Sequence, residues 1–126
     1  MCFKAPFDIV TFMAECIFCK IAGKEIPSQI VQEEADFLAF RDINPQAPTH
    51  IVLIPKVHIE RVSDLTLETS PIVGKLVLAA NRLAKQLGFS EAGYRLVINC
   101  NRDGGQTVFH LHLHLLGGRS FRWPPG

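Results

Sequence analysis

Residues 108–116 of this 126-residue chain alternate between histidine and apolar side chains, in the order Val-Phe-His-Leu-His-Leu-His-Leu-Leu. Successive side chains of a β-strand point to opposite faces, so His110, His112 and His114 are expected on one face and the leucines on the other. An apolar strand face has to be covered by the rest of the core. The segment therefore predicts a sheet with one covered face and a row of imidazoles on the other.

A long helix is expected to cover the apolar face of this sheet. Pro71 suits a first helical position, Ser70 precedes it as a candidate N-cap, and Gly88 follows as a helix end. The apolar residues between them recur at helical spacing and form one stripe, made of Ile72, Val73, Leu76, Val77, Ala80, Leu83, Ala84 and Leu87. We expect a helix over 71–87 that lies across the sheet.

Short apolar segments separated by turn residues predict the remaining elements. A short helical turn is expected within residues 20–27, strands at 29–32, 36–40, 50–54 and 94–99, and a glycine-bearing loop at 101–106. Most of these strands are too close in sequence for helical crossovers, which favours antiparallel pairing. The fold class is thus predicted as α+β, with a five-stranded antiparallel sheet, one long helix and a short N-terminal helix.

Length and composition predict one domain. At 126 residues and 48% apolar content, the chain has enough material for a single core. We expect residues 15–126 to form this domain, with a C-terminal tail at 117–126, and residues 1–14 to be a flexible extension, because Met13 resembles a natural start.

Charge and hydropathy exclude several classes of protein. The formal net charge is +1, from 13 Lys and Arg against 12 Asp and Glu, which is not the signature of a protein that coats a nucleic acid polymer. The first 14 residues lack a convincing signal-peptide cleavage site. No apolar stretch approaches the roughly 20 residues that would span a membrane. A cytoplasmic protein with no membrane partner is expected.

Three interpretations of the histidines compete. A solvated strand face usually carries Lys, Thr or Glu rather than histidine. Three ligands of one zinc ion would need adjacent side chains, yet strand geometry separates the backbones of His110 and His114 by about 13 Å, against a Zn–N bond of about 2.1 Å. The third interpretation makes His112 a nucleophile toward phosphorus, with its neighbours orienting it or handling protons. A covalent intermediate on His112 would divide the displacement into two steps.

The loop before the histidines fits phosphate chemistry. Gly104 and Gly105 allow the backbone to approach a phosphate closely, and the N–H groups of Gln106, Thr107 and Val108 are candidates to stabilise its oxygens. By itself, a Gly-Gly turn before a strand is more often a simple hairpin connection.

Segment 106–116 resembles the signature of the histidine triad family, His-φ-His-φ-His-φ-φ with φ apolar. The resemblance spans about residues 15–126, with further matches to the nucleotide-binding (Hint) branch at 17–18, 24–27, 38–40, 42–43, 45–50, 54–56, 94–95, 103–106 and 123–126. It implies hydrolysis of purine nucleoside phosphoramidates, or of aminoacyl adenylates, to a nucleoside monophosphate. It also implies a homodimer that extends the sheet through strand 94–99 and the long helix.

The resemblance implies roles for particular residues. His112 would be the nucleophile, Thr107 would lie near the leaving group, and His50, His110 and His114 would orient the nucleophile or handle protons. Phosphate contacts are implied for Asn99, Gly105 and Val108, a ribose contact for Asp42, and walls of the base pocket for Ile17, Phe18, Ile26, Ile43 and Leu53. Read without the family, Asp42 is a turn residue and the apolar residues are ordinary core.

Cys16 and Cys19 form a Cys-x-x-Cys pair, which is half of a zinc site or simply two reduced core thiols. Related bacterial histidine triad proteins suggest His50 and His110 as the other two ligands, so that a structural zinc would need no part in catalysis. In that case His110 would be structural rather than a proton relay.

Two other functions are compatible with the same motif. One is a nucleotide-binding regulatory protein without catalysis, and the other is a dinucleoside polyphosphate hydrolase from a neighbouring branch of the family. The ending Trp-Pro-Pro-Gly at 123–126 favours the Hint branch. The resemblance places this tail near the substrate cleft of the homodimer.

Overall fold

The computed structural model describes residues 16–126, so the extension expected at 1–14 lies outside the described residues. Its five strands are β1 (Ile30–Glu33), β2 (Phe37–Arg41), β3 (Thr49–Pro55), β4 (Tyr94–Val97) and β5 (Leu113–Gly117). Its helices are α2 (Ile17–Ala22), α3 (Pro71–Leu87) and α4 (Asn101–Gly104), with a short 3₁₀ helix, η1 (Val62–Asp64). Within this part of the chain, no helix combines the length and hydropathy needed to cross a membrane.

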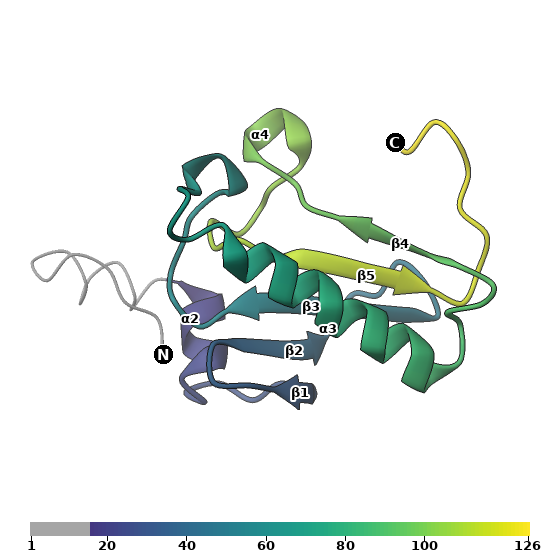
Figure 1. Ribbon diagram of the computed structural model, residues 1–126, viewed down its shortest axis with the longest axis horizontal. Coiled ribbons are helices and arrows are strands. Elements are labelled where there is room, and N and C mark those ends of the chain that lie inside the picture. Colours follow the sequence, from purple (N-terminus) through teal and green to yellow (C-terminus); the bar gives the residue numbers. More distant parts are fainter. Residues whose placement is uncertain (1–15) are drawn as a thin grey trace, which may run out of the picture.

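The strands form one antiparallel sheet in the order β1-β2-β3-β5-β4 (Figure 1). In the register of β3 and β5, His50 lies opposite Leu116 and Val52 lies opposite His114. The predicted α+β fold with a five-stranded antiparallel sheet and one long helix is confirmed. β4 pairs with β5 alone and is therefore an edge strand.

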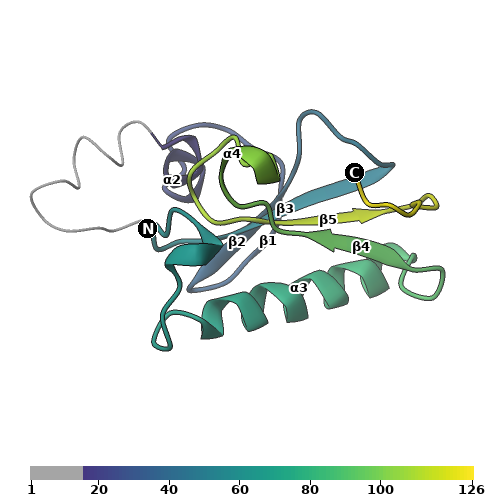
Figure 2. The same cartoon turned by 90° about the horizontal axis from the view of Figure 1, so that it is seen from above.

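Figure 2 shows α3 along one face of the sheet, with α2 and α4 on the opposite side. The pleat of the central strands divides their side chains between two clusters. Ala39 and Leu53 pack with α3, whereas Leu38 and Val52 pack with α2. Both faces of β2 and β3 are therefore covered, and the histidines share the α2 side with Val52.

The predicted cap of α3 is present at its C-terminal end but not at its N-terminal end. Gly88 adopts a left-handed conformation with φ of 90°, and its N–H donates to the carbonyls of Ala84 and Lys85. Ser70 occupies the N-cap position but makes no capping hydrogen bond, because its hydroxyl donates to the Leu67 carbonyl, 3.3 Å away. The expected side-chain cap was wrong.

The expected histidine strand is shorter than its sequence pattern. β5 begins only at Leu113, so His114 is the one histidine of the three inside it. Upstream, the Leu111 N–H donates to the Ile59 carbonyl at 2.6 Å instead of joining the β3 ladder. The backbone leaves the sheet at this point, and His110 and His112 are placed by local contacts.

Two short helices also differ from expectation. The N-terminal helix begins at Ile17, earlier than predicted, because Cys16 caps it by accepting the Cys19 N–H on its sulfur at 3.3 Å. Residues 101–104 form α4 where a loop was predicted, and Gly105 ends this turn in the left-handed conformation.

Candidate functional site

Three imidazoles gather on the sheet face that carries α2. His50 comes from β3 and His114 from the neighbouring β5, and their ring centroids are 5.1 Å apart. His112, just before β5, lies edge-on to His114 with centroids 4.9 Å apart. The antiparallel pairing of β3 and β5 thus unites residues that are distant in sequence.

Hydrogen bonds determine where the protons of His50 and His114 lie. The Gln46 N–H donates to His50 Nδ1 at 3.1 Å, so the neutral His50 ring carries its proton on Nε2. That Nε2–H donates to His114 Nδ1 at 2.8 Å, and Asp42 Oδ2 lies 3.5 Å from His50 Nε2. His114 is therefore protonated on Nε2, and the two rings form a directed chain.

A backbone hydrogen bond fixes the tautomer of His112. Its Nδ1–H donates to the backbone carbonyl of His110 at 2.7 Å, which leaves the lone pair on Nε2. Phe18 packs perpendicular to the ring, with centroids 5.0 Å apart. His112 is only 6% exposed, so its ring is firmly placed.

Burial lowers the pKa of all three imidazoles. The pKa of His114 falls to about 4, mainly through burial and then through its neighbours His112 and His50. For His112, burial outweighs the opposing effect of the His110 carbonyl on the pKa, and for His50 it outweighs that of the Asp42 carboxylate. All three pKa values lie below the ordinary value of 6.5, so the rings are neutral at pH 7 and His112 Nε2 carries a free lone pair.

The loop before His112 presents backbone donors. Among residues 16–126, the N–H groups of Thr107 and Val108 make no hydrogen bond. Thr107 is exposed and Val108 half-buried, at the end of the turn that contains Gly105. An ideal Cβ on Gly105 would lie 4.0 Å from Asn99 Nδ2, which brings the Asn99 amide beside the same loop.

Gln106 has a different role from the one expected. Its backbone N–H donates to the Asn101 carbonyl at 3.0 Å, and its buried side chain bonds the Asn101 N–H and the carbonyls of Glu60 and Val108. Its N–H is therefore used within the loop, and the prediction that it contacts phosphate is corrected. These hydrogen bonds of Gln106 stabilise the turn that precedes Thr107 and Val108.

The expected walls of the base pocket lie in three environments. Phe18 and Ile26 are half-buried beside the α2 cluster, while Ile17 and Ile43 are exposed, by 47% and 99%. Leu53 is fully buried against α3, on the face of the sheet away from the histidines, because the pleat directs alternate β3 side chains to opposite faces. The prediction for Leu53 was wrong.

Asp42 combines the two roles that the sequence left open. Its Oδ1 accepts the Asn44 N–H at 2.8 Å, which is the turn-forming role. Its other carboxylate oxygen, Oδ2, lies 3.5 Å from His50 Nε2 and so borders the imidazole group.

A second cluster contains two thiols and two imidazoles, from Cys16, Cys19, His58 and His110, with all four ligand atoms within 4.8 Å of one another. His110 Nδ1 lies 3.3 Å from Cys16 Sγ and 3.6 Å from Cys19 Sγ, and His58 Nδ1 lies 3.1 Å from Cys19 Sγ. His110 Nε2–H donates to the Pro55 carbonyl at 2.8 Å, so its Nδ1 lone pair points at the sulfurs. This donor set suits tetrahedral zinc.

The structure corrects one member of the expected ligand set, since His58 and not His50 completes it. His110 contacts Pro55 at the end of β3, five residues and about 17 Å along the strand from His50. His58 follows just beyond that end. The antiparallel pairing of the two histidine-bearing segments was the available signal, because it places His110 opposite the carboxyl end of β3.

Asp42, His50 and His114 also lie close enough to share an ion, but their protons argue against it. A metal on His50 Nε2 would move the ring proton to Nδ1, where it would face the donating Gln46 N–H. This group is better described as a hydrogen-bonded chain.

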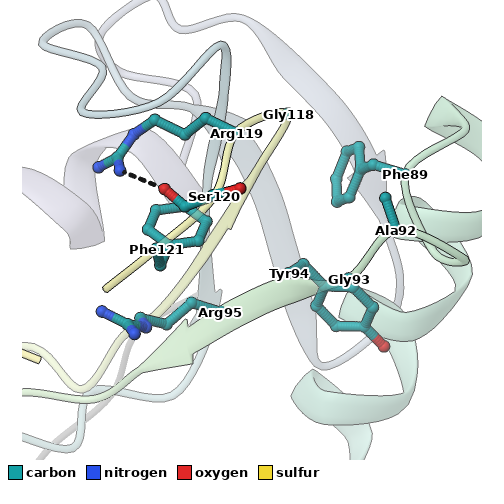
Figure 3. Close-up of a pocket in the computed structure, with 9 residues that line it drawn as sticks. All are labelled: Phe89, Ala92, Gly93, Tyr94, Arg95, Gly118, Arg119, Ser120 and Phe121. Atoms are coloured by element: carbon teal, nitrogen blue, oxygen red, sulfur yellow. Dashed lines mark hydrogen bonds between the residues drawn. The ribbon is translucent and has the colours of Figure 1, made fainter. Parts of the chain in front are cut away.

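A cavity of about 610 Å³ lies elsewhere, between β4 and the segment after β5. Figure 3 shows Phe121 between the guanidinium groups of Arg95 and Arg119, whose central carbons are 5.1 and 4.2 Å from its ring centroid. None of the imidazoles described above lines this cavity.

The model of the HIT domain matches residues 23–121, most of the chain. The chain belongs to the HIT family. A HIT family hydrolase from Legionella pneumophila Philadelphia 1 is 54% identical, with a TM-score of 0.87, and the match covers 89% of this chain and all of the other. A histidine triad protein from Clostridium difficile is 45% identical, with a TM-score of 0.84 and coverage of 86% and 94%.

Among HIT relatives, a purine nucleoside phosphoramidase from Escherichia coli (strain K12) is 51% identical over 105 residues. That alignment covers 83% of this chain and 88% of the relative. The resemblance inferred from the histidine motif is thus confirmed along nearly the whole HIT domain, well beyond the motif itself.

Proposed function

We propose that this HIT protein hydrolyses purine nucleoside phosphoramidates, and aminoacyl adenylates, to nucleoside 5'-monophosphates through a covalent intermediate on His112. The observation that carries the proposal is the donation of His112 Nδ1–H to the His110 carbonyl, which leaves Nε2 unprotonated in a buried, neutral ring. The E. coli relative named purine nucleoside phosphoramidase supports the substrate class.

The reaction has two displacements at phosphorus. His112 Nε2 forms a bond to phosphorus while the P–N bond of the substrate breaks, and the departing amine takes up a proton from solvent. Water then attacks phosphorus and releases a proton to solvent, the bond to His112 breaks to restore the neutral ring, and the nucleoside monophosphate leaves. In the intermediate the His112 ring is cationic, and the His110 carbonyl that accepts its Nδ1–H stabilises that charge.

The surrounding residues bind the nucleotide. The N–H groups of Thr107 and Val108, with Asn99 and Gly105 beside them, contact the phosphate oxygens. Thr107 also lies near the leaving group. His50 and His114 orient the site through their proton chain.

The nucleoside is recognised by a carboxylate and an apolar slot. Asp42 accepts hydrogen bonds from the ribose hydroxyls, which a carboxylate can do with both oxygens. Ile17, Phe18, Ile26 and Ile43 contact the flat face of the base. The large exposed areas of Ile17 and Ile43 are available for this contact.

Zinc is proposed as a structural ion only. Cys16, Cys19, His58 and His110 would bind it and thereby join α2 to the end of β3. His110 is then a structural residue and not a proton relay, and the reaction needs no cofactor.

The working unit is proposed to be a cytoplasmic homodimer. β4 is an edge strand, and Leu78 and Leu87 on α3 are 58% and 42% exposed. Pairing of two β4 strands would extend the sheet and cover such apolar area. Trp123, 82% exposed in the tail, is then available to contact the substrate cleft of the dimer.

The test is release of AMP from an adenosine phosphoramidate. His112→Ala and His112→Asn should lower kcat by about a thousandfold or more, because the attacking atom is removed. Cys100→Ser, a change outside the proposed site, should retain activity. Full activity in the two His112 variants would contradict the proposal, and nucleotide binding with no turnover in the wild type would favour a regulatory protein.

A parallel assay with a diadenosine polyphosphate tests the substrate class. We expect faster turnover of the phosphoramidate at equal concentration. The reverse order would assign the chain to dinucleoside polyphosphate hydrolysis.

A further inference from the structure

We infer that Cys16, Cys19 and His58 are positioning residues for the nucleophile, acting through the backbone of His110. The inference rests on the proposed function, in which His112 attacks phosphorus. It assigns the thiol and imidazole group a role in the rate of reaction in addition to its role in stability.

His110 connects the two sites through different atoms. Its ring nitrogen Nδ1 lies 3.3 and 3.6 Å from the sulfurs of Cys16 and Cys19. Its backbone carbonyl accepts His112 Nδ1–H at 2.7 Å, the bond that selects the reactive tautomer. One fully buried residue therefore contacts the thiols with its side chain and the nucleophile with its main chain.

No strand ladder positions the His110 carbonyl, because β5 starts only at Leu113. Its position depends on contacts on either side. The His110 ring donates from Nε2 to the Pro55 carbonyl, and the next residue, Leu111, donates its N–H to the Ile59 carbonyl. These local bonds leave the carbonyl sensitive to how the His110 ring and residue 59 are placed.

The cluster of Cys16, Cys19 and His58 acts on both of those contacts. Cys16 and Cys19 position the His110 ring. The contact of His58 Nδ1 with Cys19 Sγ, at 3.1 Å, fixes His58, which is the residue just before Ile59. Loss of a thiol or of His58 thus frees the backbone on both sides of the His110 carbonyl. The His112 ring then loses a defined acceptor for its Nδ1–H, and part of the population adopts the opposite, unreactive tautomer.

The experiment uses the full chain and four variants. Cys19→Ser and His58→Gln alter the group, Cys100→Ser removes a thiol outside it, and Leu83→Ala destabilises the distant core against α3. For each we would measure zinc content, the midpoint of thermal unfolding, kcat and KM for an adenosine phosphoramidate, and the ¹⁵N shifts of the His112 ring.

We expect Cys19→Ser and His58→Gln to lower kcat about tenfold with KM changed less than twofold, since the ribose and phosphate contacts lie elsewhere. Their His112 ¹⁵N shifts should move from the pure Nδ1–H form toward a mixture. Leu83→Ala should reduce thermal stability but leave the tautomer and kcat unchanged, and Cys100→Ser should change none of these quantities.

An unchanged kcat and an unchanged His112 tautomer in folded Cys19→Ser and His58→Gln would overturn the inference. So would the same loss of kcat in Leu83→Ala. If these two variants do not fold, wild-type protein before and after treatment with a chelator provides the same comparison by ¹⁵N shift. Activity that survives His112→Asn would instead refute the proposed function, so the two failures are distinguishable.

Discussion

His114 lies between two other imidazoles, and one nearby carboxylate, Asp42, favours its protonated form. Adding a proton to His114 would bury a cation and break its acceptance of the His50 Nε2–H. This arrangement explains why its pKa falls to about 4 while that of a free histidine is near 6.5. Neutrality at pH 7 is thus a property of the three-ring group.

The shifted pKa of His114 predicts a pH dependence of stability. Between about pH 4 and 6.5 the unfolded chain binds more protons at this residue than the folded chain, so the free energy of unfolding should decrease as the pH falls through that window. Urea denaturation at several pH values would measure it. His114→Gln should show a shallower slope than the wild type, and equal slopes would contradict the assigned pKa.

Gly117, at the end of β5, is required by packing. A Cβ built on it would overlap the Cδ1 and Cε1 atoms of the buried Phe89 ring. Gly117→Ala should lower the free energy of unfolding by about 1–3 kcal/mol. Gly74→Ala is the matched control, because nothing beyond its own stretch of helix backbone lies within 4 Å of the added Cβ and alanine is favoured over glycine in a helix by about 0.5–1 kcal/mol. Chemical denaturation that finds both changes neutral would refute this packing argument.

At the scale of elements, α3 is joined to the sheet by one face. Leu76, Ala80 and Leu83 are buried against alternate residues of the central strands, while residues such as Gln86 face away. The histidines occupy the opposite side of the same sheet. Changes in α3 should therefore affect stability without direct effects on the reacting atoms.

Leu76→Ala should lower the free energy of unfolding by about 2–5 kcal/mol, because the fully buried side chain would leave a cavity. Gln86→Ala, on the exposed side of the same helix, should change it by less than about 0.5 kcal/mol. Urea denaturation measures both. A similar cost for the two substitutions would mean that the helix does not pack as described.

At the scale of the whole molecule, the two faces of the sheet carry different kinds of side chain. α3 covers one face with apolar contacts, and the other carries the imidazoles and the thiol group beside α2. β4 and the exposed apolar residues of α3 remain on the outside. In the proposed homodimer, a second copy of the chain would cover these surfaces.

The proposed dimer predicts a mass in solution of twice that of one chain, measurable by sedimentation equilibrium. Leu78→Glu should shift the protein toward the monomer at micromolar concentration, because a carboxylate would be buried in the contact. Gln86→Ala should remain dimeric. A wild-type protein that sediments as a monomer at every concentration would exclude the dimer.

Local patterns predicted most of the elements. The short apolar segments at 36–40 and 50–54 correspond to β2 and β3, and the helix predicted over 71–87 has those same limits, because Pro71 and Gly88 act through their own backbone preferences. The histidine motif also singles out His112 as the candidate nucleophile, since its spacing is itself the signal. Such properties depend on neighbours in sequence and can therefore be predicted from the sequence alone.

Contacts between distant segments were decided only by the tertiary structure. The register of β3 placed His58 rather than His50 beside the cysteines, and its pleat directed Leu53 away from the histidines. The tautomers of His50 and His112 depend on backbone groups at Gln46 and His110 that no side-chain pattern reveals. The sequence by itself therefore determined which chemistry is present, whereas strand pairing determined which side chains meet, because pairing joins residues that local propensity cannot relate.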